Sequence, residues 1–536
     1  MEQKTYIVGG IGLPPSKGEA VVFEIAEKKL KSIGLCSSDP SFAIYKRSVD
    51  ARKKNDIKFV YSVAVTGDFS SVSQEKLKAA GISLQKEGKP SVIYGKQRLL
   101  ARPIVIGAGP AGLFAALLLA ENGYKPLVLE RGGSVDDRLK AVNAFREKRI
   151  LSTTDNIQFG AGGAGTFSDG KLVTRVSDPL SAYVLDTFCR FGAPKEIKFL
   201  AKPHIGTDYL QTVVSGMVSE VERLGGEVRF HTRVDGFVRR GNTVTAVVTE
   251  NGEIECGAVV VAVGNSARDT FSSLIRDGYR VIAKPFSVGL RIEHLQKDID
   301  FAMHGEFFEG HGLPHAEYAL SYNTKSRGVY TFCMCPGGEV VAAASEEGGV
   351  VVNGMSRHAR DGKNANSAVV VSVFKEDFGD DPLKAMALQR EIEHKAFLAG
   401  GSDYATPLCT VGDFLSDSYR SLPSRIEPTY MGGNAYKIAS PELFLPKFVT
   451  SSLRDGIGAF DRSVTGFSVS DALLSGAETR TSSPIRLLRT DKRTADGVDN
   501  MYPCGEGAGY AGGITSAALD GIHTAEAMMA VYSPLL

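Results

Sequence analysis

Hydrophobic and polar positions in the first hundred residues follow strand and helix periods in turn. The pattern predicts six elements, in order a strand at 4–8, a helix at 19–33, strands at 42–49 and 57–65, a helix at 72–80 and a strand at 91–94. This βαββαβ order is typical of the ferredoxin-like fold. We therefore expect residues 1–98 to form a small N-terminal domain of that type.

A second pattern begins after residue 100. The continuous apolar run at 104–106 predicts a buried strand, and the Ala- and Leu-rich run at 113–122 predicts a helix. Gly123 ends that helix, and a second apolar strand follows at 126–129. One βαβ unit results, which indicates an α/β domain with a parallel sheet of the Rossmann type.

The turn between the first of these strands and its helix carries the spacing Gly-x-Gly-x-x-Gly. The first glycine permits the tight turn, the second lets a pyrophosphate approach the backbone, and the third allows close helix–strand packing. The helix N-terminus would face the anion, and the acid that ends the second strand could accept hydrogen bonds from ribose hydroxyls. The residues expected to contact a dinucleotide here are Gly107, Gly109, Pro110, Ala111, Gly112 and Glu130.

A second glycine-rich stretch occupies residues 159–171, with four glycines in six residues. Such a stretch favours neither helix nor strand, because glycine loses much backbone entropy on ordering. It does not follow an apolar strand directly, so we interpret it as a loop that cradles the same cofactor further along. Its expected contacts are Gly165, Ser168, Asp169, Gly170 and Lys171.

Four further residues outside these glycine-rich stretches are also expected to contact the cofactor. Arg131 and Arg138 are placed to reach the adenosine or pyrophosphate end, with surface ion pairing as the alternative for Arg138. Val234 opens a predicted antiparallel meander. Gly264 ends a buried strand at 259–263 that we expect to return to the first sheet.

Near the C-terminus, an acid stands between glycines after a short strand, and a glycine pair then opens a helix. An acid in this position suits hydrogen bonds to a polyol, and the helix N-terminus would face a heterocycle that becomes anionic on reduction. NAD has no such polyol, whereas FAD carries a ribityl chain, so the segment favours FAD. Its expected contacts are Gly505, Glu506, Gly512, Gly513 and Ile514.

Composition narrows the class of protein but not its substrate. The 536 residues favour two or three domains, and 43% hydrophobic with 23% charged residues is ordinary for a globular chain. A net charge of +1 gives no reason to expect nucleic acid as a partner. No apolar run approaches the ~20 residues of a membrane-spanning helix, and seven scattered cysteines do not suggest a disulfide framework. We expect a cytoplasmic protein without a membrane partner.

With these motifs, the chain resembles a bacterial family of uncharacterised FAD-dependent dehydrogenases in the flavoprotein superfamily with two dinucleotide-binding folds. The resemblance covers nearly the whole chain and is carried by residues 107–112 with Glu130, by 162–172 and by 505–514. The acid of the last stretch is usually aspartate in that superfamily, and Glu506 stands here instead. The resemblance implies FAD, a glutathione-reductase-like FAD-binding fold and redox chemistry, but no particular substrate.

The long segment between the cofactor-binding stretches is the candidate substrate domain. His294, at the end of an alternating strand, is the best general acid or base by residue type, although a structural histidine is the more frequent outcome. Arg291 could hold a substrate carboxylate or pair with Glu293. Cys333 and Cys335 could relay electrons as a dithiol, or fill a core as neighbours on one strand face. No second Cys/His pair stands nearby at ligand spacing, so we expect no metal.

The expected domains are a ferredoxin-like domain at 1–98, the two parts of an FAD-binding domain at 99–280 and 476–536, and an inserted α+β substrate domain at 281–475. The leading hypothesis is an FAD-dependent oxidoreductase that passes a hydride between flavin N5 and a small organic substrate. Only one full Gly-x-Gly-x-x-Gly unit is found, so NADH or NADPH would have to dock transiently in the substrate cleft. The alternatives are a tRNA-modifying flavoenzyme and a flavin-binding scaffold that docks a protein partner through its N-terminal domain.

Overall fold

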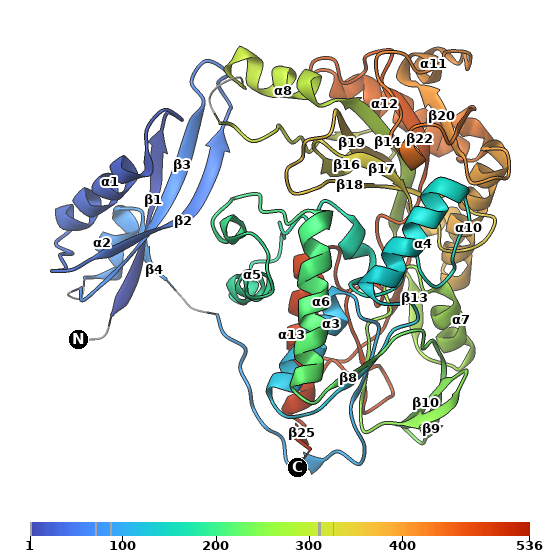
Figure 1. The fold of residues 1–536 in the computed structure, drawn as a ribbon, viewed down its shortest axis with the longest axis horizontal. Helices are drawn as coiled ribbons and strands as arrows, with labels where there is room; N and C mark the ends of the chain where they lie inside the picture. The colour runs from blue at the N-terminus through green and yellow to red at the C-terminus, as the bar shows by residue number, and fades with distance from the viewer. Residues whose placement is uncertain (1–2, 70–71, 86–87, 309–311, 325, 536) are drawn as a thin grey trace.

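The computed structural model describes residues 3–69, 72–85, 88–308, 312–324 and 326–535. Three larger sheets organise these residues, a four-stranded sheet at the N-terminus, a five-stranded parallel sheet and a seven-stranded mixed sheet. In Figure 1 the N-terminal sheet, coloured blue, lies to one side of the other two.

The N-terminal sheet has the strand order β2-β3-β1-β4. Its elements are β1 (Lys4–Leu13), α1 (Glu19–Ser32), β2 (Ser41–Asp50), β3 (Lys58–Gly67), α2 (Gln74–Ala79) and β4 (Ile82–Leu84). Alternate side chains of β3, among them the fully buried Val63 and Val65, pack in one cluster with the apolar stripe of α1.

The last strand of this sheet was predicted at the wrong place. It lies at β4, where Ile82 pairs with Val8, and not at 91–94. Residues 91–94 run past the C-terminal helix α13 (Ile514–Met529), where the Ser91 N–H donates to Glu526. Ile93 and Tyr94 are exposed here, so a short apolar stretch does not by itself distinguish a strand from an extended surface segment.

The five-stranded sheet is parallel, with the order β24-β12-β6-β7-β8. Its strands are β6 (Ile104–Ile106), β7 (Leu127–Leu129), β8 (Glu227–Arg229), β12 (Val259–Val261) and β24 (Met501–Pro503). β12 pairs with β6, which confirms the predicted return of this strand to the first sheet. The middle strands are buried on both faces, as helix-covered parallel sheets require.

Different layers cover the two faces of this sheet. One face packs against α3 (Pro110–Glu121), α6 (Thr207–Arg223) and α13, which lie side by side in Figure 1. The other face packs against α7 (Arg268–Arg276) and a three-stranded meander of β9 (Val234–Arg240), β10 (Thr243–Thr249) and β11 (Gly252–Glu255). The carboxyl ends of β6, β12 and β24 therefore lead into loops at one edge, where parallel sheets bind ligands.

The seven-stranded sheet has the order β15-β16-β19-β14-β22-β20-β21. Its strands are β14 (Phe286–Leu295), β15 (Ser321–Asn323), β16 (Gly328–Cys335), β19 (Asn364–Val373), β20 (Thr406–Thr410), β21 (Tyr436–Ile438) and β22 (Leu473–Glu478). The helices α8 (Gln296–His304), α10 (Pro382–Ala399) and α12 (Lys447–Phe460) contact this sheet.

The remaining elements connect these layers. They are β5 (Gln97–Arg98), α4 (Val135–Lys148), α5 (Ser181–Arg190), β13 (Val281–Ala283), β17 (Glu339–Ala342), β18 (Val352–Met355), α9 (Lys375–Phe378), α11 (Val411–Ser416), β23 (Ile485–Leu487), β25 (Tyr532–Ser533) and five short 3-10 helices. Among the described residues, no helix combines the length and apolar character needed to cross a membrane.

Candidate functional site

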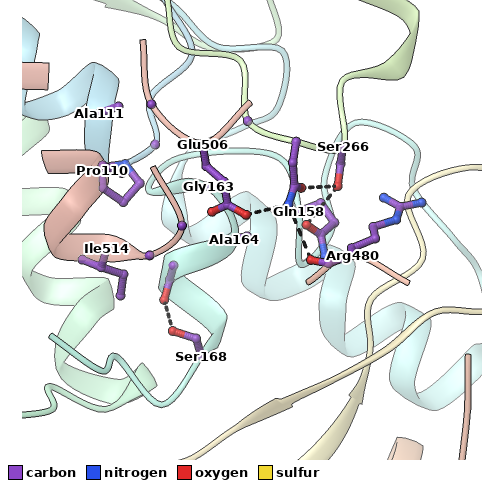
Figure 2. A pocket seen from close by; sticks show the side chains of 18 of the residues that line it. Pro110, Ala111, Gln158, Gly163, Ala164, Ser168, Ser266, Arg480, Glu506 and Ile514 are labelled. Carbon is purple, nitrogen blue, oxygen red and sulfur yellow. Dashed lines mark hydrogen bonds between the residues drawn. The ribbon is translucent and has the colours of Figure 1, made fainter. Parts of the chain in front are cut away.

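One cavity of about 530 Å³ gathers the three glycine-rich segments that lie far apart in the sequence. Its walls come from the loops after β6, β12 and β24, from the stretch at 158–171, and from residues 317–319 and 331–335 beside and within the seven-stranded sheet. In the view of Figure 2, Glu506 lies between a group with Pro110 and Ile514 and a group with Gln158 and Arg480.

The structure places most of the predicted contacts in this one cavity. The predicted residues that line it are Gly107, Gly109, Pro110, Ala111, Glu130, Arg131, Gly165, Ser168, Asp169, Gly170, Lys171, Val234, Gly264, Gly505, Glu506, Gly512, Gly513 and Ile514. Four predicted residues do not line it, namely Gly112, Arg138, Arg291 and His294.

The glycines of the cavity separate into two kinds. At Gly107, φ is +99° and an added Cβ would stand 2.4 Å from the carbonyl oxygen of Ala262, so the fold itself requires glycine. At Gly109 the nearest atom to such a Cβ is 4.0 Å away, and at Gly512 and Gly513 no atom lies within 4 Å. These three backbone positions face open space in the cavity. A bound dinucleotide that approaches the backbone closely fits that space.

Gly112 has the packing role expected of the third glycine in the motif. An added Cβ would lie 1.9 Å from the carbonyl oxygen of Gly107, so any larger residue would push α3 away from the turn. The N-terminus of α3, which begins at Pro110 after Gly109, opens toward the cavity with its unpaired N–H groups and positive dipole end.

Glu130 has more partners than the sequence suggested. Its carboxylate accepts backbone N–H bonds from Ala108 at 2.8 Å, Gly132 at 3.0 Å and Gly160 at 3.0 Å. A carboxylate offers about four lone-pair sites, so roughly one is left for a ribose hydroxyl. Glu130 therefore also fixes the turn after β6 against the loop that begins at 159.

Glu506 lines the cavity where α13 begins. Its Oε1 accepts a hydrogen bond from Asn265 Nδ2 at 2.7 Å, and burial raises the pKa of Glu506 to about 7, with Lys284 acting in the opposite direction. Behind it, the Ser266 hydroxyl donates to Gln158 at 3.0 Å. In Figure 2, Gln158 and Ser266 lie beside Glu506.

Sequence reasoning missed several cavity residues. Gln158, Asn265, Ser266 and Arg480 all line it, and none belongs to a recognisable motif. Asn265 and Ser266 could have been predicted from their position, because they directly follow Gly264 at the end of a predicted strand. Arg480 carried no such signal, since it comes from the other large sheet and reaches the cavity only through the tertiary fold.

Asp169 and Lys171 form part of a charged network at the cavity wall. Lys171 Nζ donates to Asp169 at 2.6 Å, and Arg360 donates to the same carboxylate through Nε at 3.0 Å and Nη2 at 2.6 Å. Burial opposes the ionisation of both partners. The attraction between the two charges offsets it, which lowers the pKa of Asp169 and raises that of Lys171. Ser168 donates to the Gly165 carbonyl at 2.7 Å.

Arg131 and Arg138, predicted together, occupy different environments. Arg131 lines the cavity, stacks over the Phe159 ring at 4.3 Å and pairs with Asp269 at 3.0 Å. Arg138 has no exposed surface and donates to the backbone carbonyls of Asn156, Ile157 and Ala161. It does not reach the cavity. Its buried guanidinium instead satisfies carbonyls that the glycine-rich loop leaves unpaired.

The two catalytic candidates lie elsewhere. His294 is 1% exposed, its Nε2 lies 2.8 Å from the Phe467 carbonyl, and burial lowers its pKa, so it is a structural histidine of the seven-stranded sheet. Arg291 is fully buried and donates to Glu478 at 2.9 Å and to Asn366 at 2.6 Å. Glu293, the alternative partner, shares a strand face with Arg291 but accepts hydrogen bonds from Asn364 at 3.0 Å and Thr429 at 2.6 Å instead.

Cys333 and Cys335 both line the cavity, at an irregularity in the pairing of β16 with β19. Cys333 is exposed there and has φ +44°, an unusual conformation for a residue with a side chain. Cys335 is buried, and burial raises the pKa of its thiol above the ordinary value, so Cys335 is a thiol near neutral pH. No group of three or more His, Cys, Asp or Glu side chains in the described ranges could hold a metal ion.

The fold combines a parallel sheet with a helix N-terminus that follows a glycine turn, and three glycine-rich segments line one long cavity. These features together define a dinucleotide-binding flavoprotein. Residues 101–265 match the profile of an FAD binding domain, and residues 285–481 that of the FAD-dependent protein, C-terminal domain-like family. Residues 11–66 match a domain of unknown function, DUF8436. An uncharacterized protein of Clostridium beijerinckii is 45% identical over 508 residues, which cover 94% of this chain and 95% of that relative. The chain belongs to this family of FAD-dependent proteins, and its cofactor is FAD.

Solved structures show only distant likeness. CtdE in complex with FAD is 12% identical, with 80% of this chain and 82% of that chain covered and a TM-score of 0.31. Glycine oxidase from Bacillus cereus is 10% identical, with 81% and 99% covered and a TM-score of 0.34. At these values the likeness carries no conclusion about activity.

Proposed function

We propose that this flavoprotein is an oxidoreductase that acts on a small organic substrate bound between the FAD-binding loops and the seven-stranded sheet. The observation that carries the proposal is the shared cavity. Residues of 107–111, 163–171 and 505–514 line it together with residues of the FAD-dependent C-terminal family segment at 285–481. A cofactor held by the three glycine-rich segments would face the residues of the segment at 285–481.

The chain's own residues divide the binding task. The N-terminus of α3, open at Gly109, would hold the pyrophosphate, and Glu130 would keep one acceptor site for a ribose hydroxyl. Glu506 and the N-terminus of α13 at Gly513 would hold the ribityl and ring end. When bound, FAD supplies two-electron chemistry and exchanges a hydride with the substrate, while the protein orients the reactants and excludes water.

Residues 281–475 are assigned as the substrate domain and residues 1–98 as a ferredoxin-like domain. The strand order β2-β3-β1-β4 with two helices supports the second assignment. In the proposed substrate domain, Arg291 acts as a positioning residue. Its Nη1 lies 3.3 Å from the Cys333 carbonyl oxygen and its Nη2 lies 3.1 Å from Asn353 Oδ1. Because both residues line the cavity, Arg291 holds two segments of the cavity wall together.

The proposal is tested by purifying the protein and recording its visible spectrum, with mass spectrometry of the released cofactor. We expect a yellow protein that releases FAD. Anaerobic mixing with NADH or NADPH then asks whether nicotinamide reduces the flavin. Bleaching supports transient docking in the cavity, and absence of bleaching leaves an organic donor. A protein that carries FAD yet exchanges electrons with no donor or acceptor in a broad panel would contradict an oxidoreductase.

A further inference from the structure

Lys171, Lys202 and Arg360 gather around Asp169 and Glu317, and Arg175, four residues after Lys171, lines the same cavity. We call these four cations the basic cluster. Lys171, Arg175 and Lys202 line the cavity directly, and Arg360 stands behind them at 6% exposure. Arg360 joins the cluster to the segment matched by the C-terminal family, because its Nη1 donates to Glu317 at 2.6 Å. The basic cluster therefore lies where the loop after Ser168 meets the proposed substrate domain.

The carboxylates within reach do not neutralise these cations. Asp169 accepts from Lys171 and Arg360, and Glu317 from Arg360, with Lys202 Nζ at 3.7 Å. Both acids have a lowered pKa because nearby cations offset the burial that opposes ionisation, so both are charged near neutral pH. Two carboxylates against four cations leave an excess of two positive charges. A cleft lined by one sign of charge concentrates ligands of the opposite sign.

Two of the cations have free donors. Arg175 is exposed, and within the described residues it has no hydrogen bond and no ion pair. Lys171 uses one of its three N–H groups on Asp169 and keeps 28% of its side chain exposed. A guanidinium without an internal partner and an ammonium with two remaining N–H groups can together bind one anionic group, and the planar guanidinium can do so with two parallel bonds.

Apolar side chains stand beside these donors. Val173, between the two cations in sequence, is 57% exposed and lines the cavity, and the half-buried Phe332 of β16 lines it as well. An apolar side chain left open in a cavity gains free energy when a ligand covers it. Inorganic ions would leave this surface uncovered, whereas an organic anion would cover it.

We propose that the basic cluster recognises the anionic group of an organic substrate, a refinement that rests on the function proposed above. The substrate places its carboxylate or phosphate between Lys171, Arg175 and Lys202 and lays its apolar body on Val173 and Phe332. This assigns the role first considered for Arg291 to residues that are free to take it, because Arg291 is already committed to Glu478.

The test uses the FAD-loaded protein and four probes that share a benzene ring, namely benzamide, benzoate, phthalate and phenyl phosphate. Binding is measured by calorimetry and by the change in the flavin absorption spectrum. We expect each anion to bind at least about tenfold more tightly than benzamide, and the preference to weaken with added salt. Comparison of phthalate with phenyl phosphate distinguishes a carboxylate from a phosphate site.

Arg175→Gln and Lys202→Gln are expected to weaken anion binding by about tenfold each and to leave benzamide binding unchanged. Lys195→Gln is the matched control, since it removes one charge from the same stretch of chain at an exposed residue outside the cavity. Equal affinity for benzamide and the anions would overturn the inference. So would loss of FAD, rather than of anion binding, in the two variants, because the cluster would then neutralise the cofactor's phosphates.

The two proposals fail in different ways. A protein that retains FAD and is reduced, but shows no preference for anions, contradicts only the basic cluster as a substrate site. A protein that binds no FAD contradicts the proposed function, and calorimetry with the cofactor-free chain still reports whether the basic cluster selects anions.

Discussion

Single glycines in the first binding turn have separable physical roles. Gly112 is needed by the fold, because a Cβ there would meet the Gly107 carbonyl at 1.9 Å, whereas the nearest atom to a Cβ on Gly109 is 4.0 Å away. Gly109 also has φ −75°, which any residue adopts. The chain itself therefore requires glycine at 112, whereas at 109 we propose that the requirement comes from the bound cofactor.

Gly109→Ala is expected to fold with nearly unchanged thermal stability as the cofactor-free protein, within about 0.5 kcal/mol, and to lose FAD affinity by tenfold or more. The added methyl group occupies the space open to the pyrophosphate. Gly112→Ala should instead destabilise the cofactor-free protein by about 1–3 kcal/mol through overpacking. Thermal unfolding and FAD titration of both variants measure the contrast, and equal behaviour of the two would contradict it.

Glu506 couples the stability of the cofactor-free protein to pH. Its pKa is raised by burial to about 7 from 4.5. Between these values the folded chain binds more protons than the unfolded chain, so this residue's contribution to folding falls as pH rises from about 4.5 to 7. The cost of ionising Glu506 in the folded state is fully present above pH 7.

Glu506→Gln should therefore stabilise the cofactor-free protein at pH 8 by about 1–3 kcal/mol and have little effect at pH 4.5. Chemical denaturation at the two pH values measures the difference. Glu250→Gln, at an exposed residue of the meander, is the control and should show no such pH dependence. A larger gain at low pH than at high pH would contradict the assignment.

At the scale of elements, the edge strand β2 joins the N-terminal sheet to the cavity. The Arg47 N–H donates to the Phe199 carbonyl, and the Ala201 N–H donates to the Arg47 carbonyl at 2.8 Å. The Arg47 guanidinium also lies over the Phe199 ring at 5.6 Å. These bonds hold the stretch that ends at Lys202, a residue of the basic cluster, so the N-terminal sheet supports the cavity wall from outside.

Arg47→Pro removes the N–H that faces Phe199, and proline is tolerated on an edge strand where the N–H points away from the sheet. We expect a loss of about 1 kcal/mol in the local contact and faster hydrogen exchange at the Ala201 amide. Arg47→Ala keeps both backbone bonds and loses the guanidinium contacts with the Phe199 and Phe59 rings, so exchange at the Ala201 amide should change less. Hydrogen-exchange mass spectrometry decides, and equal exchange in the two variants would show that the backbone bond contributes nothing.

At the scale of the whole molecule, a buried ion cluster ties the two large sheets together. Glu393 on α10 accepts from Arg268 on α7 at 2.6 Å and from Arg480 after β22 at 3.0 Å. The three side chains are 3%, 1% and 5% exposed. Burial opposes the charge on Glu393, but the two guanidinium groups offset it and hold its pKa below its ordinary value.

Glu393→Gln leaves two buried guanidinium groups without their carboxylate and should cost about 3–5 kcal/mol in the free energy of unfolding at pH 7. The loss should shrink as pH falls below about 4.5, because Glu393 of the unfolded wild-type chain then binds a proton while the folded carboxylate, with its lowered pKa, stays charged. Glu346→Gln, which removes a more exposed partner of Arg268, is the control and should cost less. Urea denaturation at pH 7 and pH 4 measures both variants.

Local sequence patterns predicted those elements that depend on residues near one another in the chain. Apolar runs and glycine spacing identified β6, α3 and β7, and the return of β12 to the same sheet is confirmed. FAD was predicted from an acid and a glycine pair near residue 506, and the match of residues 101–265 to an FAD binding domain confirms it. The strand predicted at 91–94 was wrong, because these residues form an extended surface segment beside α13 with Ile93 and Tyr94 exposed.

The sequence alone determined the glycine turn, the first βαβ unit and the cofactor, because each depends on residues that stand close together, at 104–129 and at 505–514. The tertiary structure decided which side chains face the cavity. It committed Arg291 to Glu478, turned His294 into the core and brought Lys202 and Glu317 beside Lys171. Those outcomes depend on contacts between distant segments, among them Arg291 with Glu478, His294 with Phe467 and Lys202 with Glu317, for which local period and spacing carry no signal.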